Sequence, residues 1–293
     1  MQQLIKRHFV GLQSCIFLIL CGALSAPAVA AEKIIKYSNA NDANGIYAVT
    51  IMKLAFAHAD QHYTFQEVGE DLTQPRQVEE VRDGKLDIMW TATSQELENT
   101  LLPVRIPLYK GLLGHRILLI REGDQARFDQ VRTLDDLRRI PIGQGTFWTD
   151  TKILEANGLK VVKAAKTQSL FFMLDGGRYD GFPRGVFEPF GEVVGHPNLK
   201  LTVEKHLMLV YKMPYYFFVS PNNKQLGSDL ELGLNRAIAD GSFEKVFLSS
   251  PNVQEAIQKG DLKNRLIFNL NNPGLPKETP VDRAELWVDP KAL

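Results

Sequence analysis

The stretches 143–150, GQGTFWTD, and 177–185, GRYDGFPRG, are the most informative parts of this chain. The first stretch follows a short apolar run at 140–142, so we expect a strand that leads into the start of a helix. The first N–H groups of a helix lack partners, and the helix dipole adds partial positive charge, so such a start attracts anions. The second stretch ends a helix, passes through a strand and is expected to place Arg184 just beyond the strand end. Together they predict a site that holds a negatively charged group.

The N-terminal segment has the pattern of a secretory signal peptide. A basic pair at 6–7 precedes an apolar run at 15–24 that is too short to span a bilayer comfortably, and small residues follow at 28–30. We therefore expect 1–30 to be a cleaved signal peptide and the mature protein to be periplasmic; an uncleaved membrane anchor is the alternative. A lipoprotein is not expected, because a leucine precedes Cys21 where lipid attachment sites have Gly, Ala or Ser.

Composition excludes several classes of function. Both cysteines, Cys15 and Cys21, lie in the segment expected to be removed, so the mature chain would have no disulfide and no cysteine-ligated metal. The chain has 34 basic and 34 acidic residues, and two of the basic ones lie in 1–30, which leaves a mature net charge of −2. Because there is no basic cluster, no nucleic-acid partner is expected. No later apolar run is long enough to span a membrane, so we expect the mature protein to be soluble. We also expect a monomer.

Apolar strand-like runs alternate with helix-like runs, which predicts an α/β fold. The expected strands are 33–37, 63–68, 86–91, 114–121, 140–142, 160–163, 179–182, 207–211 and 215–220. The expected helices are 46–58, 77–83, 133–139, 148–156, 168–174, 227–240 and 243–248. Thr133 is expected to cap its helix, with Asp136 completing a capping box. The tail at 272–287 is expected to lie across the first lobe, with Trp287 as its apolar anchor, and a disordered tail is the alternative.

Four motifs in a fixed order resemble those of the family 3 bacterial extracellular solute-binding proteins, best known as amino-acid receptors of ABC importers. They are DGKLD at 83–87 ahead of the Trp90-Thr91 strand end, RIPLY at 105–109, GQGT at 143–146 and ADGSFEKV at 239–246. The resemblance covers about 33 to 248 and is that of a divergent member with an FPRG motif at 182–185.

This resemblance implies the type II periplasmic-binding-protein fold. Each lobe would be a mixed sheet flanked by helices, two hinge crossings would join the lobes, and the ligand would lie in the cleft between them. We expect 31–116 and 213–293 to form the first lobe and 117–212 to form the second. The implied function is capture of a small carboxylate-bearing ligand, an amino acid or a related anionic metabolite, for an inner-membrane ABC permease.

Two departures from the family pattern concern the ligand. Glu96 stands where amino-acid receptors usually have the arginine that binds the α-carboxylate. The FPRG motif stands where they usually have an acidic residue for the α-amino group. An ordinary α-amino acid is therefore not a secure assignment.

The candidate ligand-binding residues belong to the loops and strand ends expected to face the cleft. They are Arg184, Thr146, Gly145, Phe147, Trp148, Arg105, Trp90, Thr91, Asp42 and Asn41. The two arginines are expected to bind carboxylate, Arg184 most directly, and Arg184→Ala is expected to leave the fold intact. The alternatives are a pair between Arg184 and Glu188 and a hinge salt bridge for Arg105.

The other candidates have simpler expected roles. Trp90 and Trp148 are expected to enclose an apolar or aromatic part of the ligand, the alternative being packing in the core. Asp42 and Asn41 are expected to hold an amine or hydroxyl, the alternative being local turn hydrogen bonds. The amides around Thr146 are expected to bind an anion, the alternative being a plain helix cap.

The sequence contains no recognisable catalytic constellation. His58 and His62 have the spacing of a metal pair but no acidic ligand follows, and no G-x-S-x-G motif occurs. We therefore expect that the protein is not an enzyme and that it binds no metal and no cofactor. Two alternatives stay open: a ligand-sensing accessory of a membrane receptor, and an exported dehydratase-like enzyme on the same scaffold with Glu96, Asp150 and Glu188 as acid–base residues.

Overall fold

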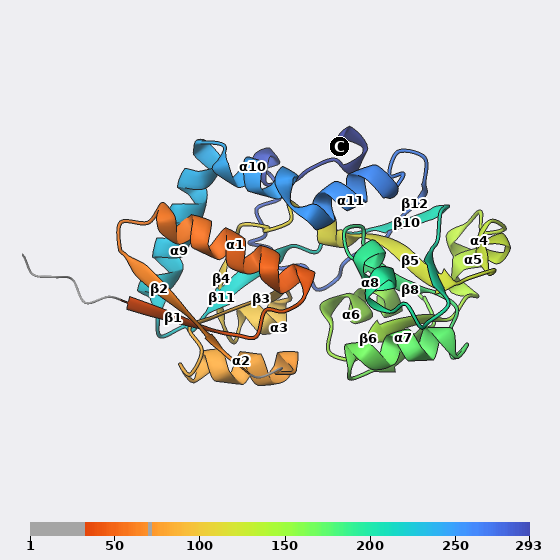
Figure 1. Cartoon of the computed structure of the whole chain (residues 1–293), viewed down its shortest axis with the longest axis horizontal. Helices are drawn as coiled ribbons and strands as arrows, with labels where there is room; N and C mark the ends of the chain where they lie inside the picture. Colours follow the sequence, from red (N-terminus) through yellow and green to blue (C-terminus); the bar gives the residue numbers. More distant parts are fainter. Residues whose placement is uncertain (1–32, 70–71) are drawn as a thin grey trace, which may run out of the picture. The chain divides into compact units, whose positions relative to one another are not determined.

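The computed structural model describes residues 33–69 and 72–293, so the signal peptide expected over 1–30 lies outside the described residues. The described chain forms two lobes, seen at the left and right of Figure 1. The first lobe contains β1 (Lys33–Ser38), α1 (Ala43–Ala57), β2 (Tyr63–Val68), α2 (Gln74–Arg82), β3 (Ile88–Ala92), α3 (Gln95–Glu98), β4 (Leu102–Val104), β11 (Tyr215–Val219), α9 (Lys224–Ala239) and α10 (Ser242–Ser249). None of the described helices has the length and apolar character needed to cross a membrane.

The second lobe is built mainly from the middle of the chain. Its elements are β5 (His115–Arg121), α4 (Gln125–Phe128), α5 (Leu134–Arg138), β6 (Ile142–Gly145), α6 (Thr149–Ala156), β7 (Val161–Ala164), α7 (Thr167–Asp175), β8 (Phe182–Gly185), α8 (Pro189–Gly195), β9 (Leu201–Val203), β10 (Leu207–Val210) and β12 (Leu266–Asn269). Helix α11 (Pro251–Lys259) precedes β12. The Thr133 capping box of α5 is confirmed, with both of its reciprocal hydrogen bonds present.

In the first lobe, α1 packs closely against α9. Ala48, Ile51, Met52 and Ala55 of α1 are fully buried. A Cβ on Gly233 of α9 would lie 1.9 Å from the Ala55 carbonyl oxygen, so only glycine permits this approach. The sheets of this lobe pair β1 with β2 in parallel, and β11 with β3 and β4 antiparallel. This packing fixes the ends of β1 and β3, which face the second lobe.

The sheet of the second lobe has the order β12-β10-β5-β8, with β9 also paired to β5. The separate parallel pair β6-β7 is joined to it by a bridge between Ile142 and Gly181, just before β8. The carboxyl ends of β6 and β8 therefore lie side by side.

Two strands lie later in the chain than the sequence indicated. Gly143 and Gly145 belong to strand β6 instead of the following turn, and Arg184 lies inside β8 instead of beyond it. Gly143 is compatible with a strand here because a Cβ would lie 2.0 Å from the ring of Tyr179, so glycine allows the tyrosine to pack onto the backbone.

The predicted assignment of all residues after 213 to the first lobe is wrong for one segment. Strand β12 pairs in parallel with β10, with Leu207 opposite Leu266, so 266–269 belongs to the sheet of the second lobe. The sequence showed an apolar run here, but nothing in the run itself indicates which sheet it joins. The other lobe limits remain a prediction.

The C-terminal tail lies over 105–114 and 211–214, two of the segments that connect the lobes (the connecting segments). Trp287 packs on Gly111, where a Cβ would lie 2.5 Å from the indole, and the Lys212 ammonium lies 4.3 Å from the centroid of the indole. The Val288 N–H donates to the Lys110 carbonyl at 2.9 Å. Trp287 is thus an anchor, but its contacts are with the connecting segments and not with the body of the first lobe.

The tail also contacts both lobes. The Asn157 side chain beside α6 donates to the Asn271 carbonyl at 2.8 Å and accepts from the Asn271 N–H at 3.1 Å. The Arg283 guanidinium donates to Asn235 of α9 at 3.0 Å. The tail therefore ties the second lobe, the connecting segments and the first lobe together.

Trp287→Ala is expected to destabilise the protein by about 2–4 kcal/mol, because the indole leaves a cavity over Gly111. The measurement is urea unfolding of the mature protein, with Val281→Ala as the control because that side chain is 47% exposed. Equal stability of the two variants would contradict the anchoring role.

His115 gives a pH dependence that can be checked. Burial lowers the pKa of this imidazole from 6.5 to about 4. The unfolded chain takes up a proton near pH 6.5 that the folded protein resists, so stability falls as the pH drops from 6.5 toward 4, by about 1–2 kcal/mol at pH 5. In unfolding experiments between pH 7 and 5, His115→Gln should lose less stability than the wild type, and identical pH slopes would refute this.

Candidate functional site

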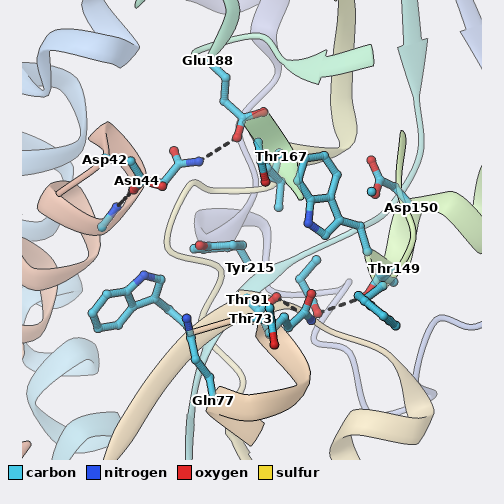
Figure 2. A pocket seen from close by; sticks show the side chains of 18 of the residues that line it. Asp42, Asn44, Thr73, Gln77, Thr91, Thr149, Asp150, Thr167, Glu188 and Tyr215 are labelled. Carbon is cyan, nitrogen blue, oxygen red and sulfur yellow. Dashed lines mark hydrogen bonds between the residues drawn. The ribbon is translucent and has the colours of Figure 1, made fainter. Parts of the chain in front are cut away.

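A cavity of about 660 Å³ lies between the two lobes, within the size range of small-molecule sites. The first lobe contributes the ends of β1 and β3 and the starts of α1 and α2. The second lobe contributes the end of β6, the starts of α6 and α7, and β8. Figure 2 shows polar side chains from both lobes around it, with the Tyr215 ring among them.

Most of the ligand residues predicted from the sequence line this cavity. Those that line it are Arg184, Thr146, Gly145, Phe147, Trp148, Trp90, Thr91 and Asp42, whereas Asn41 and Arg105 do not. The Arg105 guanidinium donates to Glu98 Oε2, at 3.1 Å from Nε and 2.6 Å from Nη2. The salt bridge considered as the alternative is therefore present, and Arg105 is not brought to the cavity.

Thr146 does not begin the helix as predicted. Its N–H donates to the Ala164 carbonyl at 3.0 Å, and α6 starts only at Thr149. The Thr149 hydroxyl donates to the carbonyl of Ala92, at the end of β3, at 3.2 Å. The start of α6 therefore contacts the first lobe directly, while Thr146 and Phe147 are exposed at the cavity.

Asp42 combines a structural contact with a place in the wall of the cavity. Its carboxylate accepts a hydrogen bond from the Gly45 N–H at 2.6 Å and so caps α1. The local hydrogen bond expected of a turn residue is present, and the same side chain lines the cavity.

Arg184 lies in the cavity wall, but its guanidinium is already paired. Nε lies 2.9 Å from both carboxylate oxygens of Glu192, and Nη2 lies 3.3 Å from Glu188 Oε1. The guanidinium carbon lies 5.0 Å from the ring centroids of Trp148 and Phe182. The predicted exposed guanidinium is therefore replaced by a buried one with internal carboxylate partners.

The two tryptophans have packing partners of their own. The Trp148 ring lies against Arg184 and on Gly145, where a Cβ would be 2.4 Å from the indole. Trp90 packs at 6.0 Å from Tyr37, between ring centroids, and also lies in the cavity wall. Both indoles are thus held in place and partly exposed to the cavity.

Arg116 was not among the residues predicted from the sequence, although it lines the cavity and binds two of its acids. It lies in β5, is 3% exposed, and its Nη2 lies 3.0 Å from Asp150 Oδ2 while its Nη1 lies 3.2 Å from Glu188 Oε2. The available signal was the charge of Arg116 directly before the apolar residues 117–120, in the run 114–121 that was interpreted as an ordinary strand. A charged group in such a run needs buried partners.

Glu188 connects the two lobes. Its Oε1 accepts from the Asn44 amide of α1 at 2.6 Å (Figure 2), and its Oε2 accepts from the Gly185 N–H at 2.6 Å. The Asn44 carbonyl oxygen in turn accepts from the Tyr109 hydroxyl at 3.0 Å, which fixes the amide's orientation. The carboxylate that binds Arg116 and Arg184 of the second lobe therefore also binds the first lobe.

The acids of this cluster differ in pKa. Burial raises the pKa of Glu188, but the nearby guanidiniums of Arg184 and Arg116 outweigh burial and hold the pKa below its usual value. For Asp150, burial dominates over Arg116 and raises the pKa. Glu188 is thus the carboxylate most firmly held in its charged form.

The three acids considered for a dehydratase are not brought together. Glu96 does not line the cavity and pairs with Lys152 at 2.7 Å with a largely exposed side chain. Asp150 and Glu188 do line it, but both bind Arg116. Within 33–69 and 72–293, no group of His, Cys, Asp and Glu side chains is arranged to hold a metal ion.

Arg184→Ala should destabilise the protein by about 3–5 kcal/mol, contrary to the expectation from sequence, because it leaves Glu192 and Glu188 buried without this partner. The control is Arg139→Ala, whose side chain is 78% exposed and whose loss should change stability by less than about 0.5 kcal/mol. Chemical unfolding of both variants measures the difference. A stable Arg184→Ala protein would mean that the pairing contributes little.

Comparisons with known proteins identify structural relatives only. No family model matches the chain, and neither does any curated protein sequence. An ancestral arginine-binding protein bound to arginine is 16% identical, with a TM-score of 0.55 over 75% of this chain and 97% of that one. A Salmonella typhimurium periplasmic binding protein with high arginine specificity is 14% identical, with a TM-score of 0.55 over 73% and 97%. A histidine kinase sensor domain similar to periplasmic binding proteins is 13% identical, with a TM-score of 0.54 over 75% and 96%.

These likenesses establish the fold, which is the two-lobed type II periplasmic-binding-protein fold predicted from the motifs. At such low identity they do not transfer a ligand. The ligand must be inferred from the residues of this cavity.

Proposed function

We propose that this protein is an exported solute-binding protein that encloses a small polar solute between its lobes. The observation that carries the proposal is the cavity of about 660 Å³ with walls from both lobes. A solute that contacts both walls favours the closed arrangement, because its binding free energy is larger there. The fold supplies the two lobes that such closure needs.

We propose that the ligand is an amino acid or a related small metabolite. Its proposed net charge differs from the sequence-based expectation. A net anion was expected because Arg184 was taken to face the cleft unpaired. Since Arg184 and Arg116 are each bound to internal carboxylates, the wall offers little uncompensated positive charge. A carboxylate is better accommodated as part of a molecule that also carries a positive group.

For the partner, we propose an inner-membrane ABC permease that receives the solute from the closed protein. The alternative of a sensing role keeps some support, because one structural relative is a histidine kinase sensor domain. Both roles use the same solute-dependent closure.

A thermal-shift screen of residues 31–293 against amino acids, dicarboxylates and aromatic acids tests the proposal. A solute at 100 times its Kd should stabilise the protein by about 2.7 kcal/mol. Calorimetry should then give one site per chain, and incubation should leave the solute chemically unchanged. Turnover of the solute would favour the enzyme alternative instead.

Trp90→Ala should weaken binding of a solute found in this way by ten-fold or more, because the indole forms part of the cavity wall. Trp287→Ala is the matched control, since this indole packs over the connecting segments away from the cavity. It should lower stability but leave the affinity unchanged. Equal affinities for wild type and Trp90→Ala would place the solute elsewhere.

A further inference from the structure

We propose that Glu188 sets the charge of the solute, so that the cavity accepts solutes without net charge and rejects net anions. This inference rests on the proposed solute-binding function and names the ligand class of the same cavity. It concerns the carboxylate that binds Arg116, Arg184 and Asn44 at once.

The formal charges around the cavity are balanced. The positive side chains that line it are Arg116, Arg184 and Lys166, and the negative ones are Asp42, Asp150 and Glu188. Glu192 lies behind this wall and binds Arg184, which makes the cluster as a whole slightly negative. A solute with a further negative charge therefore enters a site that has no net positive charge.

Each of the two guanidiniums is also bound by two carboxylates. Arg184 is bound along its Nε edge by Glu192 and flanked by two aromatic rings. Arg116 uses one terminal nitrogen for Asp150 and the other for Glu188. An anionic group that took the place of Glu188 on these cations would leave the displaced carboxylate nearby in a buried setting.

The other side chains of the cavity wall that can bind a solute include uncharged polar groups, one cation and one anion. Lys166 and Asp42 lie at the starts of α7 and α1, on opposite lobes, and neither forms a salt bridge within the described residues. Gln74 and Thr91 are joined by a 3.1 Å hydrogen bond. Both line the cavity together with Gln77 and Thr73, which are labelled with Thr91 in Figure 2. Amides and hydroxyls bind uncharged polar groups, and one group of each sign suits a zwitterion.

Glu188→Gln removes this charge with little change of shape. Each guanidinium keeps one carboxylate, Glu192 on Arg184 and Asp150 on Arg116. The glutamine side-chain oxygen can still accept from the Asn44 amide. Glu96→Gln is the matched control, because it removes one negative charge from an exposed side chain outside the cavity.

The experiment is isothermal titration calorimetry with glutamine and glutamate, which differ by one charge at nearly equal shape. The wild type should bind glutamine at least ten-fold more tightly than glutamate. In Glu188→Gln this ratio should fall at least ten-fold, and in Glu96→Gln it should not change. Asparagine with aspartate is the second pair, and thermal melts show which variants fold.

The outcomes separate the inference from the proposed function. Tighter binding of the acids by the wild type, or an unchanged ratio in a folded Glu188→Gln, would overturn the inference while solute binding stands. If neither the amides nor the acids of these two pairs bind, the same comparison is made between uncharged and anionic solutes that the wider screen finds. Tighter binding of the anionic solutes would then overturn the inference. If no solute of the screen binds, the proposed function itself is wrong.

Discussion

The ion pairs between Arg116, Glu188 and Arg184 are the constraint on which the rest of the site depends. Two guanidiniums from adjacent strands of one sheet, β5 and β8, would repel each other without the carboxylate between them. Glu188 follows β8 closely, so the chain returns this carboxylate to the strands that carry the cations. A buried charge is tolerated only with such partners, and losing one partner costs about 3–5 kcal/mol.

The same carboxylate explains how the lobes are related across the cavity. Asn44, held by the Tyr109 hydroxyl, donates to Glu188 from the first lobe. Thr149 and Lys152 make further contacts from α6 to Ala92 and Glu96. Behind the cavity, the tail with Trp287 covers the connecting segments. Polar contacts from α6 and the anchored tail therefore both link the parts of the chain that surround the cavity.

The sequence predicted the fold well because the fold follows from local patterns. Short segments of sequence are enough to predict strand β2, the Thr133 capping box and the alternation of strands and helices. The location of the cavity also followed, since Trp90 and Gly145 come from motifs at strand ends. In contrast, the pairing of β12 with β10 depends on how the chain returns after α11, which no local pattern encodes.

The chemistry of the site was harder to predict, because the sequence does not show which charged side chains are buried together. Arg184 was expected to bind the ligand, but Glu188 and Glu192, four and eight residues later, occupy it. Arg116 was missed because the middle of its strand is apolar, and its partner Asp150 comes from another element. A charge in an apolar run indicates a buried partner but not which one.

The most direct test of this account is a crystal structure of the protein grown with a solute that it binds. The account predicts the solute between Trp90, Thr91 and Lys166, with Glu188 still bound to Arg116, Arg184 and Asn44. A solute carboxylate in the place of Glu188, with the glutamate turned away from both guanidiniums, would contradict it.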